Sequence, residues 1–194
     1  MPIPDFTLDG VLPPFLGPHG PGGHPADMSP YDATALEVVT RFGTTTPRNT
    51  ILRGWLDHRA GLRAAGFLDG FQWLNGSFVE DKQPRDLDVV AFLYRPTGIL
   101  DAVSLQALMN SNPHLFLRQN VRAKYQLDFI SVDLNGTAEF LVQMSRYYMG
   151  LFSHRRNDQL WKGMLQVRLD DPIGDQAAVA ALAASSMPSG GATI

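Results

Sequence analysis

The sequence predicts an α+β protein whose mixed sheet of about four to five strands is flanked by helices. Short apolar runs rich in aromatic and β-branched residues are typical of buried strands, and longer segments with apolar residues every three or four positions are typical of amphipathic helices. Both kinds alternate along 194 residues, a length that suits one folded core. The expected helices span residues 47–65, 101–109, 137–152 and 177–184, and the expected strands span residues 71–74, 87–94, 125–132 and 164–169.

The helix over residues 47–65 has the clearest boundaries. Thr46 precedes Pro47, which is the usual arrangement of a cap residue followed by proline at the first helical position. Apolar side chains then recur at helical spacing, and Gly66 is placed to end the helix. His58 falls on the polar side of this pattern, so we expect it to be exposed to solvent.

The later elements follow from similar patterns. Residues 71–74 form a short aromatic-rich run, and residues 87–94 are apolar on both faces, as expected of a central strand covered on both sides. The segment 137–152 carries one apolar stripe at helical spacing. We therefore expect a two-sided sheet with a long helix on at least one face.

The two ends differ in composition from the middle. Residues 1–30 hold 8 of the 14 prolines and five glycines, so this stretch cannot form a helix or a central strand. Two interpretations remain open, a flexible leader and an extended arm laid across the domain. We place an N-terminal arm at residues 1–45, a folded domain at 46–170 and a C-terminal tail at 171–194, with residues 185–194 expected to be loose.

Composition excludes several classes of protein. The chain has no cysteine, which excludes disulfides, zinc–thiolate sites and a thiol nucleophile. The net charge of −3 argues against a general nucleic-acid binder, and no apolar run reaches the ~18 residues of a membrane span. The first residues do not resemble a secretory signal, so we expect a cytoplasmic protein that does not enter a membrane. The Arg-rich, Lys-poor composition hints at a bacterial source.

Two carboxylates stand at the head of the central strand. Asp86 and Asp88 are two residues apart, so they point to the same face of a strand. Carboxylates so placed repel each other and lose hydration, and a divalent cation such as magnesium or manganese relieves both costs. The alternative is a solvent-exposed strand end where the two side chains meet water.

A possible phosphate-binding turn precedes this pair. Gly76 and Ser77 directly follow the strand at 71–74. Glycine allows close approach of a phosphate or of another backbone segment, and turn amides with a hydroxyl can hold phosphate oxygens. A hairpin turn that simply needs glycine is the alternative, but a turn and an acidic pair on adjacent strands together suit a nucleotide with a metal.

The joint pattern resembles the polymerase-β-like nucleotidyltransferase superfamily, and in particular a group of small bacterial nucleotidyltransferase-like proteins. Gly76-Ser77 is followed by eight residues and then by Asp86-Leu87-Asp88. The superfamily adds a third carboxylate between apolar residues on a later strand, which Asp128 matches in this sequence. A strand-end charge or a partner of Arg122 is the alternative role for Asp128. Weaker similarities extend the resemblance over most of residues 10–169.

The resemblance implies a nucleotidyltransferase-like fold and a metal-dependent enzyme. Asp86, Asp88 and Asp128 would be catalytic and would hold Mg²⁺ or Mn²⁺, and a nucleoside triphosphate would donate its monophosphate to a protein, RNA or small-molecule hydroxyl. The expected nucleotide-binding residues are Gly76, Ser77, Lys82 and Arg85. The sequence does not identify the nucleotide, the acceptor, the oligomeric state or the role of the basic cluster at Arg155-Arg156.

Two departures from the superfamily pattern keep a second hypothesis open. Asn75 stands where an apolar residue is usual, and the short spacer contains Pro84, so we expect the helix after Gly76-Ser77 to be reduced to a turn. The alternative function is therefore a weak or inactive nucleotidyltransferase-fold module that acts through a protein partner, as in toxin–antitoxin or phage-defence systems. We favour the enzyme.

Overall fold

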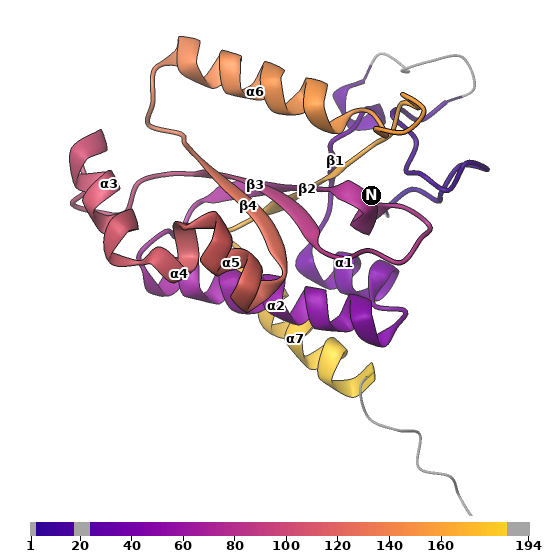
Figure 1. Cartoon of the computed structure of the whole chain (residues 1–194), viewed down its shortest axis with the longest axis horizontal. Helices are drawn as coiled ribbons and strands as arrows, with labels where there is room; N and C mark the ends of the chain where they lie inside the picture. The colour runs from indigo at the N-terminus through magenta and orange to yellow at the C-terminus, as the bar shows by residue number, and fades with distance from the viewer. Residues whose placement is uncertain (1–2, 18–23, 186–194) are drawn as a thin grey trace, which may run out of the picture.

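The protein is built around one five-stranded mixed sheet (Figure 1). The computed structural model describes residues 3–17 and 24–185. The strand order is β1-β5-β2-β3-β4, with β1 parallel to β5, β2 antiparallel to both β5 and β3, and β3 parallel to β4. The α+β class and the mixed sheet flanked by helices are thus confirmed. The strands are β1 (Tyr31–Asp32), β2 (Gly70–Asn75), β3 (Leu87–Leu93), β4 (Leu127–Asp133) and β5 (Leu165–Arg168).

Strand register sets one row of polar residues across the sheet. Asn75, the last residue of β2, pairs with Asp88, and Asp88 pairs with Asp128 on β4. Side chains alternate between the two faces of a strand, and Val90, two residues after Asp88, packs against α6. The three polar side chains therefore stand on the face of the sheet that α6 covers.

Most helices cover the other face. There Leu74, Val89 and Phe129 join residues of α1, α2, α5 and α7 in the larger hydrophobic core, while α6 lies alone across the opposite face (Figure 1). Tyr148 and Phe152 are the buried residues of α6. The helices are α1 (Ala35–Phe42), α2 (Thr46–Ala64), α3 (Ala102–Ser111), α4 (Pro113–Phe116), α5 (Arg118–Tyr125), α6 (Ala138–Phe152) and α7 (Pro172–Ser185), with the short 3₁₀ helices η1 (Pro25–Asp27) and η2 (Gly76–Val79).

Helix α2 is buried more completely than its periodicity indicates. His58 is fully buried, so the expectation that it faces solvent is wrong. Its Nε2 lies 2.9 Å from the carbonyl oxygen of Leu115, and its ring meets those of Tyr125 and Phe129 edge-on. Because α4 and α5 cover a side of α2 that looks polar in the sequence, burial lowers the pKa of His58 to about 4.

Both ends of the described chain pack against the sheet domain. In the N-terminal segment, Val11 and Leu12 are buried, and α1 contributes to the same core as α2. The first described residues therefore form an arm that lies on the domain. At the other end, α7 packs against α1 and α2. Of the loose end expected at 185–194, Ser185 is the last residue of α7, and residues 186–194 lie outside the described residues. Within the described ranges, no helix is long and apolar enough to cross a bilayer.

Candidate functional site

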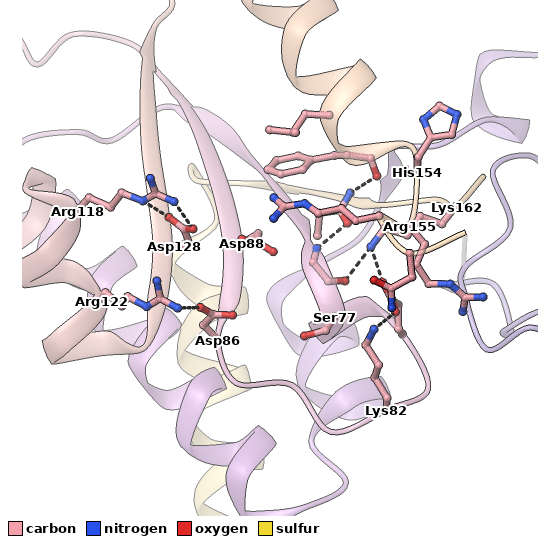
Figure 2. Close-up of a pocket in the computed structure, with 17 residues that line it drawn as sticks. Ser77, Lys82, Asp86, Asp88, Arg118, Arg122, Asp128, His154, Arg155 and Lys162 are labelled. Atoms are coloured by element: carbon pink, nitrogen blue, oxygen red, sulfur yellow. Dashed lines mark hydrogen bonds and ion pairs between the residues drawn. The ribbon is translucent and has the colours of Figure 1, made fainter. Parts of the chain in front are cut away.

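A polar pocket of about 480 Å³ opens where β3 and β4 begin and β2 ends (Figure 2). Asp86, Asp88 and Asp128 all line it, together with Gly76 and Ser77 of the turn after β2. The sheet supplies these groups because β3 and β4 are parallel, so that both strands start at the same edge. Six cationic side chains surround four carboxylates in the wall, namely Lys82, Arg118, Arg122, Arg155, Arg156 and Lys162 around Glu80, Asp86, Asp88 and Asp128.

The three aspartates form a compact carboxylate cluster. Asp88 and Asp128 are register partners on neighbouring strands, whose axes lie about 4.8 Å apart. Asp86 comes just before β3 and lines the same pocket. The structure thus brings together the three residues that the sequence assigned to the metal.

The surroundings of Asp88 favour the neutral form of its carboxyl group. Burial, followed by the charges of Asp86 and Asp128, raises its pKa to about 6, and Lys162 and Arg156 only partly oppose this. Within the described ranges, no side chain or amide donates a hydrogen bond to the Asp88 carboxylate. A half-buried carboxylate without a donor is an acceptor available to a cation.

The other two aspartates are held by arginines of α5. Arg118 binds Asp128 through two bonds, Nε to Oδ1 at 2.5 Å and Nη2 to Oδ2 at 2.5 Å. Arg122 donates from Nη2 to Asp86 Oδ2 at 2.6 Å. In this arrangement, the described part of the chain contains no group of three acidic or histidine side chains ready to hold a metal ion. The carboxylates are close in space, but two of them are engaged.

The Gly76-Ser77 turn is shaped around Asp88. Gly76 has φ +76°, and a Cβ built on it would lie 1.8 Å from Asp88 Oδ2, so the carboxylate occupies the space that any other side chain would need. The turn continues only as η2, one turn of 3₁₀ helix, as expected from the short spacer. Asn75 Nδ2 donates to the carbonyl of Phe152 at 2.7 Å, and Asn75 Oδ1 accepts from Gly76 N at 2.5 Å. The unusual asparagine therefore ties the turn to the end of α6.

Replacing Gly76 with alanine is expected to destabilise the protein by about 2–4 kcal/mol, because a left-handed alanine costs roughly 1–2 kcal/mol and overpacking adds about as much again. Gly98→Ala is the matched control, since Gly98 has φ +89° but no neighbour within 4 Å of the added Cβ. Urea unfolding of both variants separates the backbone cost from the clash. Equal losses at the two positions would show that Asp88 does not press on the turn.

A buried lysine connects the Gly76-Ser77 turn to Glu80 by hydrogen bonds. Lys162 is 4% exposed, and its Nζ donates to the carbonyl of Gly76 at 3.0 Å and to Glu80 Oε1 at 2.7 Å. Lys82 Nζ lies 2.6 Å from the other oxygen of Glu80. Burial favours a raised pKa for Glu80, but the hydrogen bonds and charges of the two lysines outweigh it and lower that pKa. Burial also lowers the pKa of Lys162.

The basic residues that the sequence analysis singled out differ in whether they line the pocket. Lys82 lines the pocket but is paired with Glu80, whereas Arg85 is exposed and is not among the residues that line the pocket. Arg155 lines the pocket rim and binds Asp158 and the carbonyl of Asp9. Arg156 is exposed at the same rim.

The site residue set predicted from the sequence did not include Arg118, Arg122, Glu80 or Lys162. The only sequence signal for the two arginines is their spacing of four residues, which places them on one side of a helix. The sequence analysis named Arg122 as an alternative partner of Asp128. The observed partner is Arg118, one helical turn earlier.

The chain matches a protein-family model over most of its length. Residues 4–168 match the model of a family of unknown function, DUF6932. No curated protein and no solved structure matches the chain. The matched span contains the whole carboxylate cluster, the Gly76-Ser77 turn and the five strands. The chain therefore belongs to the DUF6932 family of unknown function.

Proposed function

We propose that this chain is a metal-dependent nucleotidyltransferase that moves a nucleoside monophosphate from a nucleoside triphosphate to a hydroxyl acceptor. The observation that carries the proposal is the position of Asp88 and Asp128, side by side on parallel strands, with Asp86 beside them and the Gly76 turn against Asp88. The sequence resemblance to polymerase-β-like nucleotidyltransferases supports it.

The donor chemistry of the cluster suits magnesium or manganese. Hard divalent cations prefer carboxylate oxygens, and Asp88 offers a half-buried carboxylate that no described donor satisfies. Burial and then the charges of Asp86 and Asp128 raise the pKa of Asp88, and a cation bound beside this carboxylate would favour its charged form. Asp86, Asp88 and Asp128 would hold the metal, and bound Mg²⁺ would neutralise charge on the reacting phosphates.

The remaining residues suit the triphosphate. Lys82 and Arg156 place positive charge at the pocket wall, as binding a polyphosphate requires. Ser77 offers a hydroxyl beside the turn. In the reaction, the acceptor oxygen forms a bond to the α-phosphorus, the bond between that phosphorus and the α–β bridging oxygen breaks, and pyrophosphate leaves. The hydroxyl proton passes to a carboxylate of the cluster, for which Asp128 is our candidate.

The test uses triphosphates labelled at the α or the γ phosphate. With Mg²⁺ or Mn²⁺ we expect label from one or more of the four α-labelled ribonucleotides to reach the protein itself, an RNA or a small hydroxyl compound, while γ-label leaves in pyrophosphate. We also expect metal plus triphosphate to raise the melting temperature, because a ligand that binds only the folded state stabilises it. Transfer of γ-label to the acceptor, or no effect of metal and nucleotide on melting, would contradict the proposal.

The ion pairs of Arg118 and Arg122 favour a second candidate, a module that binds nucleotide without transferring it. In that case the melting temperature rises with nucleotide and metal, but no α-label moves to any acceptor. The cytoplasmic location expected from the sequence stays a prediction.

A further inference from the structure

The two arginines of α5 are placed as counter-ions of the carboxylate cluster. Their side chains are 64% and 58% exposed, whereas those of their partners Asp128 and Asp86 are 17% and 19% exposed. Asp128 lies on β4 and Asp86 directly precedes β3, and in each pair the arginine of α5 reaches the carboxylate from the more exposed side (Figure 2). The arginine is the partner that can leave without disturbing the core.

Helix stability does not account for Arg118. It is the first residue of α5, where the helix dipole disfavours a positive charge. Val121 and Tyr125 anchor α5 in the core instead. The contact with Asp128 is thus the interaction that the Arg118 side chain gains at this position.

The same contacts stand in the way of a metal. Arg118 engages both oxygens of Asp128, so a cation that binds Asp128 competes with this guanidinium for the same oxygens. Arg122 engages one oxygen of Asp86 and leaves the other. Displacement should therefore cost more at Arg118 than at Arg122.

We propose that Arg118 and Arg122 are resident counter-ions that compete with a divalent cation for the cluster carboxylates, and that the phosphate groups of the nucleotide bind the guanidinium groups that the cation releases. This inference rests on the proposed function. A guanidinium binds phosphate oxygens with the same two-pronged geometry that it uses for a carboxylate, and both arginines already line the pocket. Metal and triphosphate would then bind cooperatively, because the metal releases the two guanidinium groups that the phosphates bind.

The first test measures the affinity of the nucleotide-free full chain for Mn²⁺. Electron paramagnetic resonance detects the Mn²⁺ that remains free in solution. Arg118→Gln is expected to tighten Mn²⁺ binding roughly two- to five-fold, which is the effect of losing one exposed ion pair, and Arg122→Gln is expected to tighten it less. Arg118→Lys should fall between wild type and Arg118→Gln, since an ammonium cannot grip both oxygens. Arg155→Gln is the matched control, because Arg155 lines the same pocket but binds Asp158.

The second test is the affinity for α,β-methylene ATP at saturating Mg²⁺. Here Arg118→Gln and Arg122→Gln are expected to weaken binding several-fold, the opposite sign to their effect on Mn²⁺. A purely structural role would weaken both ligands together, and unchanged melting temperatures of the variants would exclude misfolding.

The outcomes separate this inference from the proposed function. Equal Mn²⁺ affinity in wild type and Arg118→Gln, or an equal gain in Arg155→Gln, overturns the counter-ion role. If Asp88→Asn abolishes Mn²⁺ binding in that same experiment, the metal site itself stands. If neither wild type nor any variant binds Mn²⁺ or the Mg²⁺ nucleotide, both proposals fall.

Discussion

Replacing Asp88 with asparagine is expected to abolish nucleotidyl transfer while making the metal-free protein more stable at pH 8. Asparagine has nearly the same shape as aspartate but no charge, so the metals lose the one cluster carboxylate that no described donor satisfies. The loss in transfer rate should be on the order of a hundredfold or more, since a metal ion supplies several kcal/mol of charge stabilisation. The pair of measurements is α-label transfer and urea unfolding in EDTA.

The gain in stability follows from the raised pKa of Asp88. With a folded pKa of about 6 against an ordinary value of 3.8, the folded state keeps a proton between these pH values that the unfolded state has released. The contribution of this proton to the free energy of unfolding is therefore fully present below pH 3.8. It is lost as pH rises through about 6, which lowers the free energy of unfolding by up to about 3 kcal/mol. Asp88→Asn does not titrate, so its advantage over wild type should grow across this window and stay constant above it.

Asp57→Asn is the control for the stability effect, because Asp57 is exposed on α2. An exposed carboxylate has no burial cost to relieve, so this variant should not show the gain in stability at pH 8 that is expected of Asp88→Asn. An Asp88→Asn protein that unfolds more easily than wild type at pH 8 would mean that Asp88 supports the sheet, and the interpretation of Asp88 as a metal ligand would be wrong.

Replacing Arg59 with methionine is expected to lower the free energy of unfolding by about 3–5 kcal/mol. The Arg59 side chain is fully buried and donates to Asp175 at 2.7 and 2.9 Å, to Gln72 Oε1 at 2.9 Å and to the carbonyl of Arg168 at 2.6 Å. Removing one partner of a buried ion pair leaves the other charge poorly compensated. In a chain of this length the loss corresponds to a fall in melting temperature of roughly 10 °C.

The control is Arg63→Met, because Arg63 also binds Asp175 but is 16% exposed. Arg63→Met should lower the free energy of unfolding much less than Arg59→Met does, since Asp175 keeps its contacts with Arg59. The double change Arg59→Met with Asp175→Leu should recover part of the loss, as it removes both buried charges. A loss below about 1 kcal/mol for Arg59→Met would contradict the role of this pair in holding α7 to the sheet domain.

Local patterns in the sequence predict the elements that carry the site. The strands around Trp73, Val90 and Phe129 follow from short apolar runs, and the same-face position of Asp86 and Asp88 follows from strand geometry. The pairing of Asp88 with Asp128 needed the resemblance as well, because strand order is a long-range property. The burial of Arg59 and His58 could not be predicted from α2 alone, since the helices that cover them lie far away in the sequence.

The same limit applies to the charges in the pocket. Arg118 and Arg122 meet their aspartates only because α5 packs beside β4, and nothing in the local sequence specifies that packing. Lys162 reaches Glu80 across 82 residues of chain. The sequence thus predicted the candidate metal ligands, while the cationic residues that pair with them were found only in the fold.

The most direct test of the proposed nucleotidyltransferase site is a crystal structure with Mn²⁺ and α,β-methylene ATP, with the metal located by anomalous scattering. We expect a manganese peak in contact with carboxylate oxygens of Asp86, Asp88 and Asp128, with the triphosphate beside the Gly76-Ser77 turn. A nucleotide bound elsewhere, or no manganese between these aspartates while Arg118 and Arg122 keep their ion pairs, would contradict the assignment of the site.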